Sequence, residues 1–308
     1  EEFDVVEDIS SESYLKTMNK EYAIVYGRKR HIILQEATGP DGRHRLNEWH
    51  EQTFKRKFSD KLVQEGRGRA KSHAEIWLDW ENRRQYDDFY FNPGKDLNPR
   101  FYNTWRGWAA KPTPYANASD NAKKGFDMFM SHLLENISEG DQKICDWVFG
   151  YFAHLIQKPE EKPLTTMVFK GKKGVGKNAI LERITRIIPP ENVVLATNSR
   201  YLTSNFNGHM EGCLSLILDE AFWSGDKAAD GILKGLTTNP TIWIEKKGED
   251  PYSAKNYLRI IITGNEAWIV PASTDERRYA VFQVGEKRKR DNKFFEEYNK
   301  TVAQILLT

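Results

Sequence analysis

The sequence of 308 residues is long enough for two domains that each have a hydrophobic core. It is 39% hydrophobic and 29% charged, and it contains no run of about 18 apolar residues, which excludes a membrane-spanning helix. Because 46 basic and 44 acidic residues almost balance, the net charge of +2 neither requires nor excludes a nucleic-acid partner.

The ends of the sequence and its two cysteines indicate its setting. No signal-peptide pattern is present at the start, Glu1 replaces an initial methionine, and the last residues are the apolar run "VAQILLT". We therefore expect a fragment of a larger protein. Cys145 and Cys213 have apolar neighbours and no metal-binding spacing, which is typical of buried thiols in a reducing compartment, so we expect a cytoplasmic protein.

Residues 1–100 predict a small mixed α/β accessory region of winged-helix-like type. Two apolar runs flank the basic segment "GRKR" at residues 27–30, which predicts a β-hairpin with a basic tip. Apolar residues at helical spacing predict one helix over residues 47–63 and another over residues 74–86.

Residues 101–163 predict a connector followed by a helical hairpin or bundle. Residues 92–120 are rich in Pro, Gly and Asn and show little periodicity, which is typical of a connecting segment. Two helices are predicted next, over residues 121–136 and 141–157, and prolines end the second of them.

Residues 164–308 change to short apolar runs that alternate with helical patterns. The runs are "LTTMVFK", "ENVVLAT", "CLSLILDE", "YLRIIITGNE" and "RRYAVFQV". Strands separated by helices predict a three-layer α/β domain with a mostly parallel sheet, which is the fold class that a phosphate-binding loop requires.

The stretch "GKKGVGKN" matches a phosphate-binding loop (P-loop) and lies between a predicted strand and a predicted helix. Its candidate nucleotide-binding residues are Gly171, Gly174, Gly176, Lys177 and Asn178. In such a loop backbone N–H groups surround phosphate oxygens, the helix N-terminus adds partial positive charge, and the lysine reaches the β and γ phosphates. The predicted cofactors are therefore ATP and Mg²⁺, although Asn178 stands where a Ser or Thr hydroxyl is expected to meet the metal ion.

Two later strands end in polar residues suited to the same site. "LSLILDE" ends in Asp219 and Glu220, and an NTPase needs one carboxylate for Mg²⁺ and a second to polarise the attacking water. "YLRIIITGNE" carries Asn265 at its end, where an amide can contact the γ phosphate or orient water. Both strands follow the P-loop in the chain, which favours a catalytic site over solvated loop residues.

Two basic pairs complete the candidates. Arg277 and Arg278 precede the last predicted strand, and a guanidinium can stabilise the charge on a transferred phosphoryl group, often from a neighbouring subunit. Lys246 and Lys247 lie in the turn "KKGED" after a predicted strand at residues 241–245. That turn predicts a basic hairpin that contacts a nucleic-acid backbone, and a solvated turn fits the same spacing equally well.

Taken in order, "GKKGVGKN", "LSLILDEAFW", "IEKKGEDP", "RIIITGNE" and "DERRYAVFQV" resemble the superfamily III helicases of viruses, phages and plasmids, which are AAA+ ATPases that form hexameric rings. Upstream, "YNTWRGWAAKP" and "VFGYFAHLIQKPEEKP" are similar to the region before the ATPase in phage primase-helicases. The resemblance covers approximately residues 101–284 and is closest to the helicase-like C-terminal region of bacteriophage primase-polymerases.

The resemblance implies roles for individual residues. Lys177 would bind phosphates, Asp219 would hold magnesium together with the Asn178 amide, Glu220 would activate water, and Asn265 would be the polar sensor. The remaining implied residues are a finger that acts across a subunit boundary, Arg277 or Arg278, and two hairpin residues that face DNA in a central channel, Lys246 and Lys247.

The implied function is ATP-dependent translocation of a homo-oligomeric, hexameric ring on single-stranded or fork DNA, alongside the polymerase or primase part of the same parent chain. Asn178 departs from the family pattern, because its amide is bulkier than a hydroxyl. A nucleotide-binding ring that hydrolyses weakly or not at all, and serves to hold DNA, is therefore the alternative. A P-loop ATPase that does not bind DNA is a third possibility.

Overall fold

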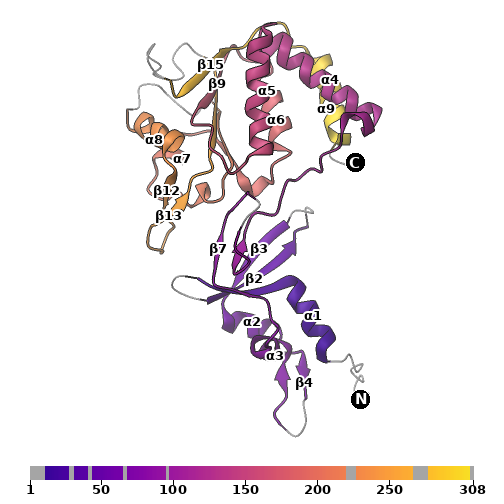
Figure 1. The fold of residues 1–308 in the computed structure, drawn as a ribbon, viewed down its shortest axis with the longest axis vertical. Coiled ribbons are helices and arrows are strands. Elements are labelled where there is room, and N and C mark those ends of the chain that lie inside the picture. The colour runs from indigo at the N-terminus through magenta and orange to yellow at the C-terminus, as the bar shows by residue number, and fades with distance from the viewer. Residues whose placement is uncertain are drawn as a thin grey trace. The chain divides into compact units, whose positions relative to one another are not determined.

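The computed structural model of this chain describes most of its residues and divides them into two compact units (Figure 1). The described residues are 11–27, 31–40, 44–64, 68–94, 97–219, 227–265 and 277–305. The units are Glu1–Thr104 and Trp105–Thr308.

The first unit is built on a four-stranded sheet with the strand order β3-β2-β1-β6. Its strands are β1 (Tyr22–Tyr26), β2 (His31–Thr38), β3 (His44–Trp49) and β6 (Gln85–Tyr86). Strands β1 and β2 pair antiparallel, which confirms the predicted hairpin, while its basic tip at residues 28–30 lies outside the described residues. Four short strands form two further pairs, β4 (Leu62–Val63) with β5 (Lys71–Ser72) and β7 (Asp88–Tyr90) with β8 (Phe101–Asn103).

Three helices pack on this sheet around Phe54 and Trp77, which are fully buried. They are α1 (Ser11–Glu21), α2 (Glu51–Lys57) and α3 (His73–Asp79). Two helix predictions were wrong in extent. Residues 47–49 belong to β3, because their backbone completes the ladder of β2, and α3 ends at Asp79, after which the chain extends and pairs with β1.

The second unit begins with the connector and the two predicted helices. The connector contains a short 3₁₀ turn, η1 (Tyr115–Asn117). The helices are α4 (Asp120–His132), which continues as a π-helical turn, η2 (Leu133–Ile137), and α5 (Gln142–Gln157). Ser119 and Asp141 cap the first backbone N–H groups of α4 and α5, so both helices begin where the sequence predicts.

The second unit then forms a five-stranded sheet with the order β10-β11-β14-β9-β15, in which every neighbouring pair is parallel. Its strands are β9 (Thr166–Lys170), β10 (Val193–Ala196), β11 (Ser215–Asp219), β14 (Arg259–Gly264) and β15 (Tyr279–Gln283). Helices α5 and α6 (Lys177–Thr185) lie on one face, and α7 (Arg200–Thr203) and α8 (Lys227–Thr238) lie on the other (Figure 1). The predicted three-layer α/β fold with a parallel sheet is confirmed.

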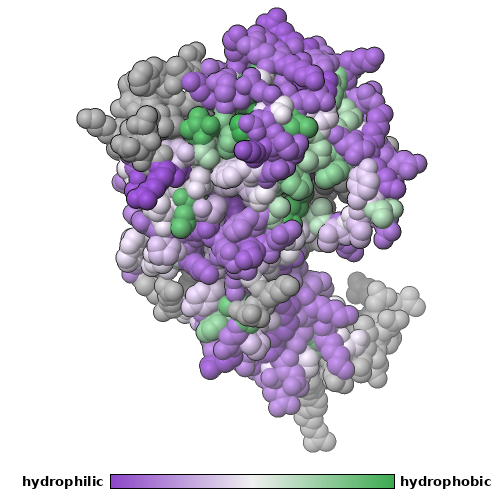
Figure 2. Space-filling view, turned by 45° about the horizontal axis from the view of Figure 1, so that its top comes forward, coloured by the Kyte–Doolittle hydropathy of each residue, from purple (hydrophilic) through white to green (hydrophobic). Residues whose placement is uncertain are grey.

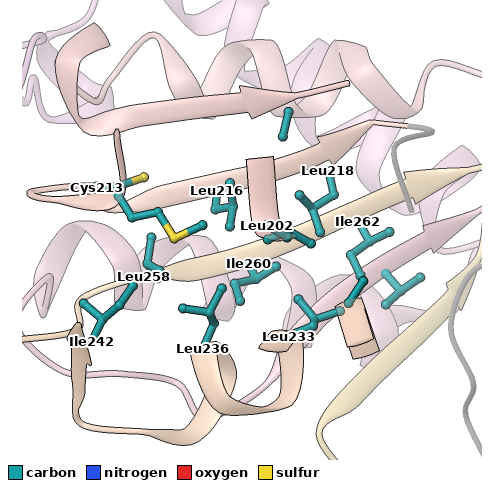
Figure 3. Packing of buried hydrophobic residues seen from close by; sticks show 14 of the residues in the cluster. Leu202, Cys213, Leu216, Leu218, Leu233, Leu236, Ile242, Leu258, Ile260 and Ile262 are labelled. Carbon is teal, nitrogen blue, oxygen red and sulfur yellow. The ribbon is translucent and has the colours of Figure 1, made fainter. Parts of the chain in front are cut away.

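Alternate residues of the central strands supply the core between the sheet and α8. Leu216 and Leu218 of β11 point to the same face as Ile260 and Ile262 of β14, where Leu233 packs against them (Figure 3). Strand residues of the opposite parity, such as Ile217 and Ile261, are also buried. Burial on both faces explains why these strands read as continuous apolar runs.

The remaining elements of the second unit lie outside the sheet. A hairpin is formed by β12 (Thr241–Ile244) and β13 (Tyr252–Lys255), which confirms the strand predicted at residues 241–245. The others are the 3₁₀ turns η3 (Pro190–Asn192) and η4 (Gly208–Met210), and α9 (Asn292–Ile305), which packs against α4.

The visible surface is mostly hydrophilic, and hydrophobic residues reach it in separate small patches (Figure 2). Among the described residues, none of the helices is both long enough and apolar enough to cross a membrane.

Candidate nucleotide-binding site

The P-loop leaves the C-terminal end of β9 and turns directly into α6. Gly174 and Gly176 have φ angles of +78° and +88°, which L-residues with a side chain rarely adopt. Gly176 is the N-cap of α6, and Lys177 is the first residue of the helix. The glycine spacing of the motif is therefore required by the backbone path, and the free N–H groups of the helix N-terminus lie at the loop.

The side chain of Lys177 is 93% buried, since only 7% of it is exposed, and it folds back over the loop. Its Nζ donates to the carbonyl oxygens of Gly171 and Lys172, the latter at 3.0 Å, and to Oδ1 of Asn265 at 2.8 Å. A buried ammonium group requires such partners. The predicted phosphate-binding lysine and the predicted polar sensor are thus in direct contact, although they are 88 residues apart.

The two predicted magnesium ligands are also in contact. Nδ2 of Asn178 donates to Oδ2 of Asp219 at 2.9 Å, and the hydroxyl of Thr263 donates to Oδ1 of the same carboxylate. Asp219 and Thr263 are register partners on the adjacent strands β11 and β14. The sheet therefore brings both acid and hydroxyl to the edge at which the P-loop lies.

This donor set fits a magnesium ion that is held mainly by ATP. No group of three or more His, Cys, Asp and Glu suited to a metal occurs within the described ranges. Mg²⁺ commonly keeps several waters and takes only one or two protein oxygens in addition to substrate phosphates. The carboxylate of Asp219 and the amide oxygen of Asn178 would supply these two oxygens. Glu220, the predicted base, lies outside the described residues.

The predicted arginines lie at the opposite edge of the sheet from the P-loop. Tyr279 is in register with Thr166, the first residue of β9, whereas the P-loop follows the last residue of that strand. Arg277 and Arg278 are therefore separated from the loop by the length of β9, roughly 13 Å for five residues. Arg277 is exposed, and Arg278 is partly buried.

The two hairpin lysines differ in their surroundings. Nζ of Lys246 forms an ion pair with Glu211 at 2.5 Å, and the hydroxyl of Tyr252 donates to the same carboxylate. Lys247 is exposed in the turn between β12 and β13. Trp243, whose ring is 68% exposed, lies on β12 of the same hairpin.

Three polar residues of the site were missed by sequence reasoning, namely Thr263, His132 and Asn136. His132 and Asn136 are fully buried and contact the back of the P-loop, at the carbonyl oxygens of Gly176 and Val175. The sequence feature that could have indicated them is that these two polar residues are four positions apart, on the apolar side of a predicted helix. Burial lowers the pKa of His132 to about 4, and the charges of Arg288 and Arg183 act in the same direction.

Comparison with known proteins gives the site a context. A family of unknown function, DUF5906, matches residues 169–278, the segment from the P-loop to the arginine pair. The chain is 26% identical over 176 residues to the DNA primase-polymerase of Nitratiruptor phage NrS-1. This similarity covers 56% of the present chain and 24% of the phage protein, so the chain matches about a quarter of its relative's length.

Solved structures extend the similarity to the whole fold. The apo structure of the NrS-1 C-terminal region matches 97% of this chain and 67% of its own with a TM-score of 0.66. A second apo structure of that region matches 98% and 69% with a TM-score of 0.65. At 17% identity each, these matches are evidence of the fold. The predicted resemblance to the C-terminal region of a phage primase-polymerase is confirmed.

Proposed function

We propose that this chain is an ATP-dependent DNA helicase module of the superfamily III type, part of a phage replication primase-polymerase, which translocates on single-stranded DNA as a ring. The relative in phage NrS-1 is a DNA primase-polymerase, which supports a role in phage DNA replication. The chemistry of the site supports an ATPase.

The observation that carries the proposal is the convergence of four polar residues at one edge of the sheet. They come from the start of α6 and from the ends of β11 and β14, and they are Lys177, Asn178, Asp219 and Asn265. Solvated loop residues would have no reason to meet in this way. Together they offer a cation, a carboxylate and two amides beside the N–H groups of a helix N-terminus, which suits a triphosphate with its metal ion.

Each residue has a distinct task in the proposed reaction. The loop N–H groups bind the phosphate oxygens, and Lys177 exchanges its contacts with loop carbonyls for contacts with the β and γ phosphates. Asn265, which already contacts Nζ of Lys177, is positioned beside the γ phosphate. Mg²⁺, when bound with ATP, neutralises charge on the phosphates. Glu220 directly follows Asp219 and is the proposed base for the attacking water.

The proposed ring follows from the distance between the arginines and the P-loop of the same chain. Because β9 separates the two, an arginine that stabilises the transferred phosphoryl would come from a neighbouring copy. We propose Arg277 for this role, because its side chain is exposed where that of Arg278 is partly buried. ATP would then be bound between subunits of a hexamer.

The proposed DNA contact is the β12–β13 hairpin. Lys247 is an exposed cation in its turn, whereas Lys246 is engaged by Glu211 and holds the hairpin to the core of the unit. A phosphate backbone is bound mainly through charge, so Lys247 is the stronger candidate for direct contact.

One observation favours the alternative of a slowly hydrolysing, DNA-holding ring. Nδ2 of Asn178 donates to Asp219, so the amide N–H₂ competes with a metal ion for the carboxylate. Substituting Asn178→Ser tests this point. Faster hydrolysis would identify the amide as a brake, and lost hydrolysis would show that the site is built around it.

The proposed function is tested by measuring ATP hydrolysis with Mg²⁺, with and without single-stranded DNA, together with the oligomeric mass under each condition. We expect an oligomer whose ATPase rate rises with DNA. An assembled, nucleotide-binding preparation without hydrolysis would refute the motor and support the DNA-holding ring. ATPase activity without single-strand affinity at moderate salt would indicate a P-loop ATPase that does not act on DNA.

A further inference from the structure

The back of the P-loop, the side away from the proposed phosphates, is held by two side chains of one helix. His132, the last residue of α4, and Asn136, in the π-helical turn that follows, are both fully buried. Nε2 of His132 lies 3.0 Å from the carbonyl oxygen of Gly176, and Nδ2 of Asn136 donates to the carbonyl oxygen of Val175 at 2.7 Å.

The histidine contact defines a neutral ring with its proton on Nε2. A carbonyl oxygen can only accept, so Nε2 must donate, and burial disfavours a second proton on Nδ1. There is also no space between Gly176 and the rings behind it. A Cβ atom on Gly176 would lie 2.7 Å from the ring of His132 and 2.5 Å from that of Phe295, so the loop packs directly on both rings.

Asn136 connects the loop to a third segment, the chain that follows β15. Its side-chain Oδ1 accepts a hydrogen bond from the backbone N–H of Arg288 at 2.9 Å. Its backbone carbonyl oxygen accepts one from the backbone N–H of Gly285 at 2.8 Å. Farther along, the N–H of Arg290 donates to the carbonyl of Gly174 at 3.0 Å. Consecutive carbonyls of the loop are thus all engaged from behind.

Because the peptide bond is planar and trans, these contacts to the carbonyls also fix the direction of the backbone N–H groups on the opposite side of the loop. In such a peptide the C=O and the N–H of the next residue point in opposite directions. A bond to the carbonyl of Val175 therefore turns the N–H of Gly176 forward, and a bond to the carbonyl of Gly176 turns forward the N–H of Lys177. Forward N–H groups at a helix N-terminus are the donors that bind phosphate.

We propose that His132 and Asn136 are positioning residues of the nucleotide site, which fix the phosphate-binding N–H groups by holding the carbonyls behind them. The inference rests on the proposed nucleotide binding, and it assigns part of the affinity for phosphate to a helix outside the P-loop motif. Preorganised donors bind more tightly because less order is lost when the ligand arrives.

Matched substitutions separate positioning from packing. His132→Phe keeps a ring and removes the donor, whereas His132→Gln keeps a donor that can reach the same carbonyl. Asn136→Asp keeps the shape and the acceptor for Arg288, and it replaces the donor to Val175 by an oxygen. Asn192→Asp is the control, because Nδ2 of Asn192 donates to the carbonyl of Gly212 at the same 2.7 Å, away from the P-loop.

Two measurements are made on the 308-residue chain, after circular dichroism has verified that each variant is folded. The first is the affinity for ATP with Mg²⁺. The second is hydrogen exchange of the amides in residues 171–178 without nucleotide. We expect His132→Phe and Asn136→Asp to weaken ATP binding about tenfold or more and to accelerate exchange of these amides. His132→Gln and Asn192→Asp should stay within about threefold of the wild type in affinity.

The two readouts distinguish failure of this inference from failure of the proposed function. If the wild type binds no ATP, the proposed function is refuted, and hydrogen exchange still tests whether the two side chains hold the loop. If the wild type binds ATP and both donor-removing variants retain its affinity and its exchange rates, the positioning role is overturned. Equal loss in His132→Gln and His132→Phe would overturn the role of the His132 donor.

Discussion

The two edges of the parallel sheet in the second unit carry polar residues of different kinds. At the edge where the strands end, Lys177, Asp219 and Asn265 contact one another or their neighbours through side chains. At the edge where the strands begin, the guanidinium of Arg259 is buried and donates to backbone carbonyls, and Arg277 is exposed. The first edge is organised as a site, and the second combines a structural cation with an exposed one.

For the proposed phosphoryl transfer, the two edges offer different groups. The edge with the P-loop carries the buried ammonium group of Lys177, the proposed cation for the ground-state phosphates. The other edge offers Arg277 and lacks a P-loop. A ring of identical subunits would bring the two unlike edges together at each contact between copies.

The largest expected effect follows from removing the exposed arginine. Arg277→Ala should lower the ATPase rate by about 10³-fold, because it removes the guanidinium proposed to stabilise negative charge in the transition state, and it should leave ATP affinity within about threefold. Steady-state kinetics and equilibrium binding measure the two quantities. Arg278→Ala is the matched control and should have a smaller effect on the rate.

Mixing variants tests whether the two edges act across subunits. Arg277→Ala and Lys177→Ala should each be inactive alone, but mixed rings should recover part of the activity, since some contacts join an intact P-loop to an intact arginine. Recovery in the mixture would establish the division between edges. Mixtures that exchange subunits and remain inactive would contradict it.

Acid pH should lower the free energy of unfolding through His132, which packs behind the P-loop. The unfolded chain protonates His132 near pH 6.5, and the folded chain does so only near pH 4, so between these values only the unfolded state gains the proton. The free energy of unfolding should therefore fall as pH falls through this window, by up to about 3 kcal/mol.

Urea unfolding at several pH values, compared between the wild type and His132→Phe, isolates this contribution from the other histidines. The difference between the two chains should change between about pH 6.5 and pH 4 and be constant above pH 7. A difference that does not depend on pH would show that His132 is not held neutral in the folded state.

The effect of the P-loop lysine on ATP affinity is expected to be smaller than the effect of Arg277 on the ATPase rate. Lys177→Ala should weaken ATP binding about 10- to 100-fold, because one charge-assisted contact with the phosphates is lost. Isothermal titration with ATP and Mg²⁺ measures this loss. Lys173→Ala provides the control, since Lys173 is an exposed lysine of the same loop. This variant should bind ATP with the affinity of the wild type. Equal losses in the two variants would indicate a general effect of charge.

The smallest effect should come from the hairpin. Lys247→Ala should reduce the dependence of single-strand affinity on salt by about 0.7 in the log–log slope, the amount that corresponds to one phosphate contact. Lys246→Ala should change the slope less, because its ammonium group is paired with Glu211. Fluorescence anisotropy over a series of salt concentrations distinguishes the two. An unchanged slope for Lys247→Ala would remove the hairpin from the DNA contact.

Predictions from sequence were most successful where burial makes the pattern simple. The runs around Val168, Leu216 and Ile261 are apolar at every position because helices cover both faces of the sheet, and each was predicted as a strand. In the first unit Trp49 lies at the end of an edge strand of the four-stranded sheet, and its apolar spacing was mistaken for that of a helix. Pairing with β2 decided that segment, and pairing is not visible in local periodicity.

The candidate site divides in the same way. Lys177 and Asp219 could be predicted because glycine spacing and strand ends mark them in the sequence. Thr263, His132 and Asn136 could not, because each becomes part of the site only through contacts between distant segments. The opposed positions of the P-loop and Arg277 also required the order and direction of the strands.

The contacts behind the P-loop also determine how long a fragment of this chain must be to keep the loop fully hydrogen-bonded. The loop carbonyls of Val175 and Gly176 are satisfied from residues upstream of β9, and that of Gly174 from Arg290, downstream of β15. A fragment cut at the motif boundaries, from β9 to β15, would leave these three carbonyl acceptors without their donors and would lack the rings of His132 and Phe295 that pack on Gly176. A fragment that keeps all of these contacts when it is transferred into another protein therefore has to run from α4 through α9.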